Sequence, residues 1–160
     1  MKDIVDLKVT QIRLYPIDVL PIAAVLVEKN LAPFKDTLRF KTASAGEAKS
    51  EGVNLELLGG EIEHEGKIHL IERVSIERQR LILSVFGTSA IADASYEEVR
   101  KAMVTADPEG PFPRTEPYLK VEETSCVATL DVGFRQLFTP PLLRFLEKAI
   151  RSRTSTKLAS

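Results

Sequence analysis

Apolar and polar residues alternate over several short stretches of this chain, while in other stretches apolar residues recur at helical spacing. Alternation, as at Val53 and Leu55, is typical of strands with one buried face. Recurrence every three or four residues, as at Tyr96, Val99 and Met103, indicates a helix with one apolar side. The pattern therefore predicts a chain that contains both strands and helices.

The strand-like stretches are separated by polar residues, glycines and prolines. They span residues 4–14, 37–43, 53–63, 67–76, 80–86 and 118–132. The small, polar residues 44–52 between two of them are expected to form a mobile loop. Because short connections usually join strands that lie side by side, we expect a mostly antiparallel sheet arranged as a meander.

Residues 19–30 admit two interpretations. Asp18 can cap a helix and Pro21 is tolerated in a first turn, which favours a helix over the whole stretch. A buried strand over residues 22–27 is the alternative, since periodicity cannot separate a short apolar strand from a helix.

Two later helices have clearer signals. Residues 95–104 begin with Ser95 and Glu98 at the spacing of a capping box, and residues 89–94 can extend this helix backward. The C-terminal residues 139–153 place a threonine at the cap and a proline at the first helical position, and their apolar residues form one stripe. This stretch predicts an amphipathic helix.

Together these elements predict one α+β domain over residues 1–153. Its sheet is a mostly antiparallel meander packed by two or three helices, the C-terminal amphipathic helix among them. Residues 154–160 are expected to form a flexible tail.

Composition supports a soluble protein and narrows its partners. Of 160 residues, 44% are hydrophobic and 28% charged, with 22 Lys and Arg against 23 Asp and Glu. This balance does not indicate a basic surface extending over the whole fold. The start, MKDIVDLKV, lacks the apolar core of a signal peptide, and the apolar run at residues 19–27 is far shorter than the ~20 residues of a membrane span. With a single cysteine, Cys126, the chain fits a reducing compartment, and we expect a cytoplasmic location without membrane contact.

Both histidines lie in the segment EIEHEGKIH, residues 61–69. A three-residue loop ending at Gly66 would place Ile62 opposite Ile68 on one face and glutamate opposite Lys67 or His69 on the other. On that register His64 is at the loop tip, far from His69, so the two rings cannot share a metal. We therefore interpret the segment as a hairpin and expect no metal site.

Other candidates for chemistry are incomplete. The segment FGTSA, residues 86–90, lacks the second glycine of a nucleophile elbow. Asp93 is a lone carboxylate in the sequence, and Cys126 lies on an apolar strand face where thiols are usually structural. Nucleotide-binding motifs are absent from the sequence, so we expect no cofactor and assign no catalytic residue.

The favoured hypothesis is thus a non-enzymatic binding or self-assembly module that forms a homo-oligomer, most simply a dimer, because long strands need their edges paired or covered. Phe112 is expected to be an exposed contact in a proline-rich loop. The first alternative, which leaves enzymatic activity open, is an apolar small-molecule cavity between the sheet and the C-terminal helix, lined by Tyr118, Thr124 and Cys126. The second is weak nucleic-acid binding through a basic stripe on that helix, made by Arg144, Lys148 and Arg151.

Overall fold

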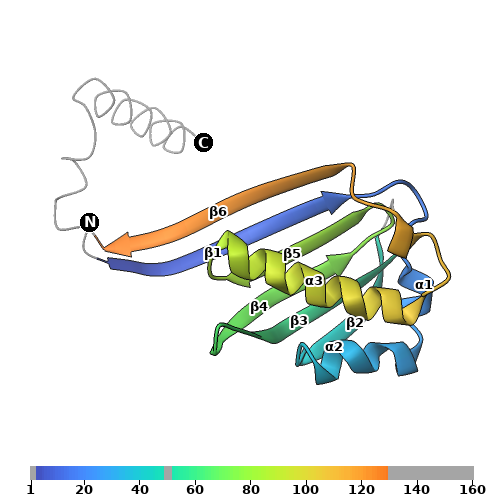
Figure 1. Cartoon of the computed structure of the whole chain (residues 1–160), viewed down its shortest axis with the longest axis horizontal. Helices are drawn as coiled ribbons and strands as arrows, with labels where there is room; N and C mark the ends of the chain where they lie inside the picture. The colour runs from blue at the N-terminus through green and yellow to red at the C-terminus, as the bar shows by residue number, and fades with distance from the viewer. Residues whose placement is uncertain (1–2, 49–51, 130–160) are drawn as a thin grey trace, which may run out of the picture. The chain divides into compact units, whose positions relative to one another are not determined.

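The computed structural model describes residues 3–48 and 52–129. They form an antiparallel six-stranded sheet with α-helices and 3-10 helices (Figure 1), so the expected α+β class is confirmed. In chain order the elements are β1 (Asp3–Leu14), α1 (Ile22–Val25), η1 (Glu28–Leu31), α2 (Ala32–Asp36), β2 (Thr42–Ala48), β3 (Gly52–His64), β4 (Lys67–Ile76), β5 (Arg80–Phe86), α3 (Ser89–Ala106), η2 (Phe112–Arg114) and β6 (Leu119–Thr129).

The chain divides into two compact units. One comprises residues 6–126, and the other combines residues 1–5 with residues 127–160. Of the second unit, the structure describes only the strand ends at residues 3–5 and 127–129. The single domain expected over residues 1–153 remains a prediction. The amphipathic helix at residues 139–153 and the tail after it lie outside the described residues.

The strands are ordered β2-β3-β4-β5-β1-β6. Strands β2 to β5 form a meander of successive antiparallel neighbours, as expected. β1 then lies between β5 and β6, with Val9 opposite Val85, so the meander does not extend over the whole sheet. The chain passes from β5 through α3 before it returns as β6 alongside β1 (Figure 1). β2 and β6 are consequently the two edges of this sheet.

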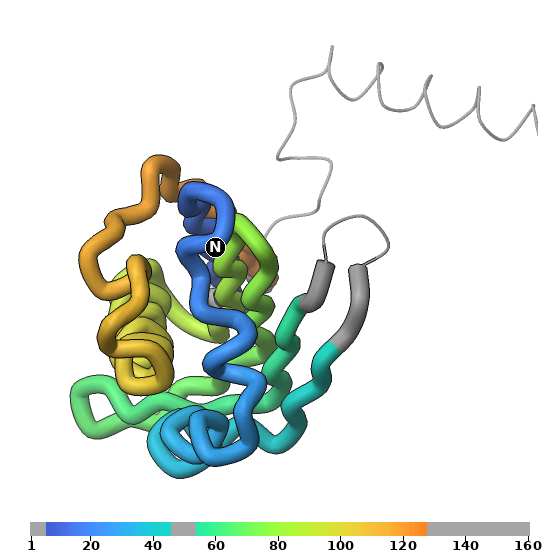
Figure 2. Tube along the Cα trace, turned by 90° about the vertical axis from the view of Figure 1, so that its right-hand side faces the viewer, coloured from blue at the N-terminus to red at the C-terminus, as the bar shows by residue number. Residues whose placement is uncertain are grey.

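The hydrophobic core lies between one face of the sheet and the helices. α3 runs across that face (Figures 1 and 2), and its apolar side is buried against alternate residues of the central strands. Each valine, leucine or methionine among them contributes roughly 1.5–3 kcal/mol when it is removed from water. The central members of this core are Val9, Leu57, Val74, Leu83, Val85, Ala92, Tyr96, Val99 and Met103.

α3 begins at Ser89, so the backward extension expected from the sequence is confirmed. The expected capping box at Ser95 and Glu98 is wrong. Thr88 occupies the cap position, and the buried Ser95 hydroxyl donates a 2.8 Å hydrogen bond to the carbonyl of Ile91 inside the helix. A serine can satisfy its hydroxyl in this way without ending the helix.

Residues 19–30 are helical in part, and the alternative strand over residues 22–27 is wrong. The single helix expected there is also wrong, because α1 covers only Ile22–Val25 and η1 and α2 follow as separate short elements. Val27 breaks the run with an extended backbone, at φ −68° and ψ 125°. Pro33 lies in the first turn of α2, where proline is tolerated.

The structure differs from the prediction of a strand at residues 37–43 followed by a loop at residues 44–52. β2 begins only at Thr42 and continues to Ala48, which places the small, polar residues within the sheet. Ala45 pairs with Leu55 of β3 in this ladder. Pairing with a long neighbouring strand therefore outweighs the local preference of these residues for a loop. Residues 49–51 lie outside the described part of the chain.

The β3–β4 hairpin is present, but its expected register is wrong by one residue. His64 pairs with Lys67, so the turn consists of Glu65 and Gly66 alone. Both have positive φ, at 52° and 75°, as a type I′ turn requires. Ile62 therefore pairs with His69 rather than with Ile68. Ile62 is buried, whereas Ile68 is 63% exposed.

Candidate functional site

A network of polar side chains joins β1, the first turns of α3, and β6. Its centre is Gln11, which is only 1% exposed. The Gln11 amide nitrogen donates 2.9 Å hydrogen bonds to Oδ1 of Asp93 and to Oε2 of Glu122. The Lys120 ammonium donates to the same Asp93 oxygen at 2.7 Å. A neutral donor thus bridges two carboxylates, and a cation on β6 completes the contact.

Arg13 extends this network toward the core. Its Nη2 donates to Oδ1 of Asp93 at 3.0 Å and to Oε1 of Gln11 at 3.2 Å. The guanidinium carbon lies 3.3 Å from the centre of the Tyr96 ring, a cation–π contact. The Tyr96 hydroxyl is 2.5 Å from that of Tyr15, and burial with this hydrogen bond raises the pKa of Tyr15. The arginine side chain is therefore fixed between an acidic and an aromatic surface.

Both carboxyl groups of the network favour the ionised form. Burial alone would raise the pKa of Asp93, but hydrogen bonds from Lys120 and Gln11 together with both nearby cations lower it below its ordinary value. A hydrogen bond from Ser89 is the main cause that lowers the pKa of Glu122, followed by that from Gln11. The network is consequently charged at neutral pH.

The turn between β5 and α3 brings Ser89 to Glu122. Gly87 has a φ of 145°, and a Cβ added there would lie 2.5 Å from Cδ1 of Ile91. Only glycine therefore allows this close approach. The Ser89 hydroxyl donates a 2.5 Å hydrogen bond to Oε1 of Glu122, which ties β6 to the start of the helix.

The network fixes one face of β6 and leaves the other face open. Lys120 and Glu122 contact residues of α3 and the inward side of β1, so they lie on the helix-bearing face of the sheet. Side chains alternate along a strand, which places Leu119, Val121 and Glu123 on the opposite face. Leu119 and Val121 are each 45% exposed. β6 is thus a held edge strand that carries exposed apolar side chains.

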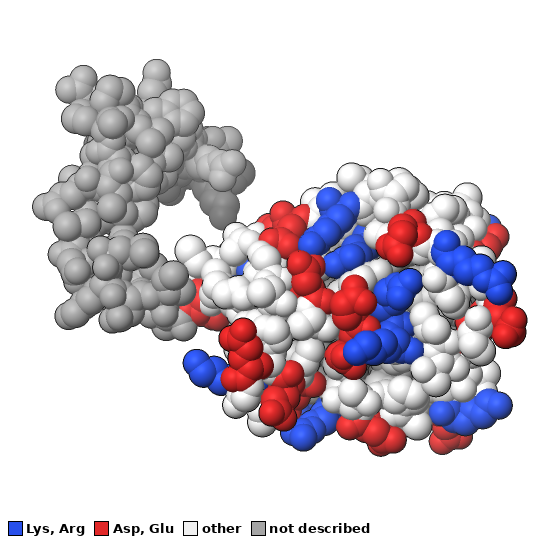
Figure 3. Space-filling model, viewed as in Figure 1, with Lys and Arg blue, Asp and Glu red and all other residues white. Residues whose placement is uncertain are grey.

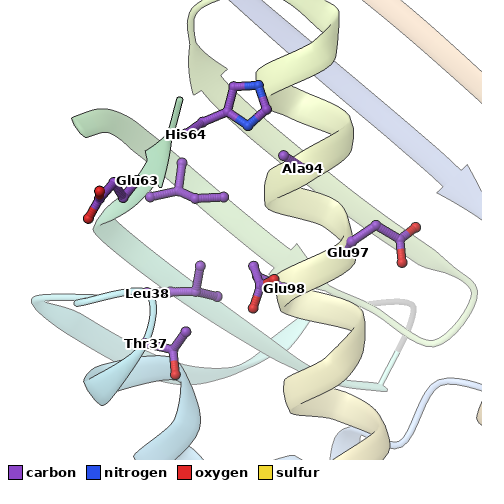
Figure 4. Close-up of a pocket in the computed structure, with 8 residues that line it drawn as sticks. Thr37, Leu38, Glu63, His64, Ala94, Glu97 and Glu98 are labelled. Atoms are coloured by element: carbon purple, nitrogen blue, oxygen red, sulfur yellow. The ribbon is translucent and has the colours of Figure 1, made fainter. Parts of the chain in front are cut away.

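A cleft of about 340 Å³ lies between α3 and the β3–β4 hairpin (Figure 4). Its lining combines the apolar Leu38, Ile62 and Ala94 with Thr37, Glu63, His64, Glu97 and Glu98. Figure 4 shows Glu63 and Glu97 pointing to different sides, away from one another. Glu98 already forms a 2.6 Å ion pair with Lys101. The acidic groups therefore do not converge on one point where a ligand could be held.

The residues expected to line a pocket do not enclose one within the described ranges. Tyr118 is 63% exposed, and Thr124 and Cys126 are exposed on β6. The C-terminal helix expected to cover them lies outside the described residues. These three residues remain a prediction as pocket residues, whereas their place on or beside the edge strand is given by the fold.

The expected exposure of Phe112 is wrong. Its side chain is fully buried, and its ring centroid lies 5.5 Å from that of Tyr15. The 3-10 helix η2 turns the ring inward, because the large apolar side chain gains more from the core than from solvent. Arg144, Lys148 and Arg151, the other expected contacts, lie outside the described residues.

Sequence reasoning missed the polar network, and it treated Asp93 as a carboxylate without a partner. Gln11 and Asp93 are 82 positions apart, and Gln11 and Glu122 are 111 apart. A local signal did exist, since Gln11 and Arg13 interrupt the alternate positions where a one-sided strand should be apolar.

The described surface gives little indication of other ligands. Basic and acidic residues are interspersed over the face that carries α3 (Figure 3). Within residues 3–48 and 52–129, groups of three or more His, Cys, Asp or Glu suited to a metal ion are absent. The helices in these ranges are too short or too polar to cross a membrane.

Fold and site together define an α+β protein whose distinctive feature is an anchored, exposed edge strand. Comparisons with models of protein families, with curated proteins and with solved structures found no match to this chain. The inference of function therefore depends on the geometry alone.

Proposed function

We propose that the chain is a non-enzymatic self-assembly module that forms a homo-oligomer through the edge of β6. The observation that carries this proposal is the pair of exposed apolar residues on that edge, Leu119 and Val121, beside a network that holds the strand in place. An edge strand presents backbone donors and acceptors that another strand can satisfy. A second copy offers the same groups in a complementary order.

β6 suits this role better than β2, the other edge. The side chains at residues 42–45 of β2 are small, being threonine, alanine and serine, so pairing there would bury little apolar area. β6 also begins after Pro117 and has neither proline nor glycine within it. Edges that must stay unpaired commonly carry proline, bulges or lysines on their exposed face. The open face of β6 carries Leu119 and Val121 before Glu123, and its lysine, Lys120, lies on the helix-bearing face.

The network supports binding rather than catalysis. Asp93 accepts hydrogen bonds from Gln11, Arg13 and Lys120, and Glu122 accepts from Gln11 and Ser89. Groups used in this way fix the position of β6. These side chains already lose their conformational entropy when the monomer folds, so the edge is preorganised and association does not have to order it.

Light scattering coupled to size-exclusion chromatography tests the proposal on the full chain. Wild-type protein is expected to elute as an oligomer whose mass is a multiple of the 17.8 kDa chain mass. The fraction of protein in this oligomer should rise with protein concentration. Val121→Lys adds a charge on the open face of the edge and is expected to weaken association at least tenfold. Ile68→Lys, at another exposed apolar strand position, is the matched control and should associate like wild type.

A wild-type chain that stays monomeric at the highest soluble concentration would overturn the proposal. Equal loss of association in both variants would show that general surface hydrophobicity, rather than the β6 edge, is responsible. Urea unfolding of each variant separates either result from a loss of folding.

A further inference from the structure

We propose that two copies pair antiparallel along β6 with Val121 on the two-fold axis, so that Lys120 of each copy faces Glu122 of the other. This inference rests on the proposed function, and it adds the register and the closed, dimeric form of the assembly. A strand paired with its own copy about a two-fold axis generates a dimer, whereas β6 paired with β2 of another copy would generate an open chain of molecules.

Symmetry limits the registers that are possible. In an antiparallel pair, directly opposite residues project on the same face of the sheet. Lys120 and Glu122 share the helix-bearing face, so the axis must pass through a residue of β6 rather than between two residues. The registers centred on the part of β6 that the network holds have the axis at residue 120, 121, 122 or 123.

Charge selects among these registers. An axis at residue 120 would place the two copies of Lys120 opposite each other, and an axis at residue 122 or 123 would oppose two glutamates. Like charges directly opposite one another destabilise a pair of strands. An axis at Val121 instead puts Lys120 opposite Glu122 twice, with the two Val121 side chains in contact on the other face.

In the monomer, Lys120 and Glu122 already lie close to one another on the face where the contact would form. Nζ of Lys120 lies 3.9 Å from Oε2 of Glu122 in the same strand, and both side chains are partly exposed. Each Lys120 would gain a second carboxylate while it keeps Asp93, and each Glu122 would gain a second cation while it keeps Gln11. The dimer would thus join the two networks across the axis on the helix-bearing face, while Glu123 on the other face would lie opposite Leu119 at the solvent-exposed rim.

A cysteine scan of the edge tests the register. Cys126 is first changed to serine to remove the native thiol, and Leu119→Cys, Val121→Cys and Glu123→Cys are then made singly in that background. Directly opposite Cα atoms lie about 4.5–5.5 Å apart, which a disulfide can bridge. A shift of the axis by one residue separates a residue from its own copy by about 7 Å more.

Under mild oxidation, Val121→Cys is expected to form the covalent dimer at least tenfold faster than Leu119→Cys or Glu123→Cys. Light scattering of each reduced variant shows separately whether the non-covalent dimer exists. Preferential cross-linking at residue 119 or 123, or equal rates at all three, within a proven dimer would overturn the register but not the proposed function. A monomer in every reduced variant and in the Cys126→Ser parent would overturn both.

Discussion

At the scale of single residues, the unusual feature is a neutral amide placed between two carboxylates. A buried polar side chain is costly unless its groups are hydrogen-bonded, and Gln11 meets this condition through Asp93, Glu122 and Arg13. Because glutamine donates without carrying a charge, it lets both acids stay ionised beside one another. Gln11 is therefore expected to determine how firmly β6 is held.

Replacing Gln11 with methionine should reveal this role through its pH dependence. The variant keeps the side-chain volume but loses two hydrogen bonds to carboxylates and one from Arg13, so unfolding at pH 7 should require at least about 3 kcal/mol less than in wild type. The pKa values of Asp93 and Glu122 are lowered by folding, so the stability they provide is present above their unfolded pKa values and is lost as the pH falls through the folded ones.

The deficit of the Gln11→Met variant should therefore shrink below about pH 4, as both acids become protonated. Urea unfolding at a series of pH values measures it. Thr10→Val is the matched control, because within the described residues the Thr10 hydroxyl is hydrogen-bonded to the neutral Ser84 hydroxyl at 3.0 Å, so the effect of this substitution should not change with pH. An equal deficit for Gln11→Met at pH 7 and pH 3 would contradict the assigned role.

At the scale of elements, local pattern predicted the central strands best. β4 and β5 occupy the predicted residues 67–76 and 80–86, since alternation and turn residues there agree with the final pairing. β2 could not be predicted because its strand conformation comes from pairing with β3. The candidate network could not be predicted because its members meet only through tertiary structure.

The predicted hairpin register is wrong because the turn has two residues, Glu65 and Gly66, rather than three, and this difference can be tested. Asparagine accepts positive φ more readily than glutamate, so Glu65→Asn should raise the free energy of unfolding by about 0.5 kcal/mol. Gly66→Ala should lower it by about 1 kcal/mol, since alanine is strained at φ 75°. Urea unfolding measures both free-energy changes. Glu63→Asn is the control, because Glu63 lies in β3 outside the turn, and this substitution should not be stabilising. Had the turn been the three-residue loop, Glu65 would not need positive φ, and no gain from asparagine would follow.

At the scale of the whole molecule, the two edges of the sheet differ in the side chains that they present. β2 presents small side chains, whereas β6 presents Leu119 and Val121 on a strand that the Gln11 network holds in place. The remaining surface on the helix-bearing face mixes both signs of charge (Figure 3). The proposed self-association through β6 is based on this asymmetry and would leave β2 unpaired.

Hydrogen–deuterium exchange at two protein concentrations, one below and one above the association midpoint, tests this claim most directly. The outward-facing amides, at alternate positions among residues 119–125 of β6, are expected to exchange at least tenfold more slowly at the higher concentration, because a partner strand would bind them. Amides of residues 42–48 in β2 are expected to exchange at the same rate in both samples. Protection that appears in β2, or exchange in β6 that does not depend on concentration, would contradict association through β6.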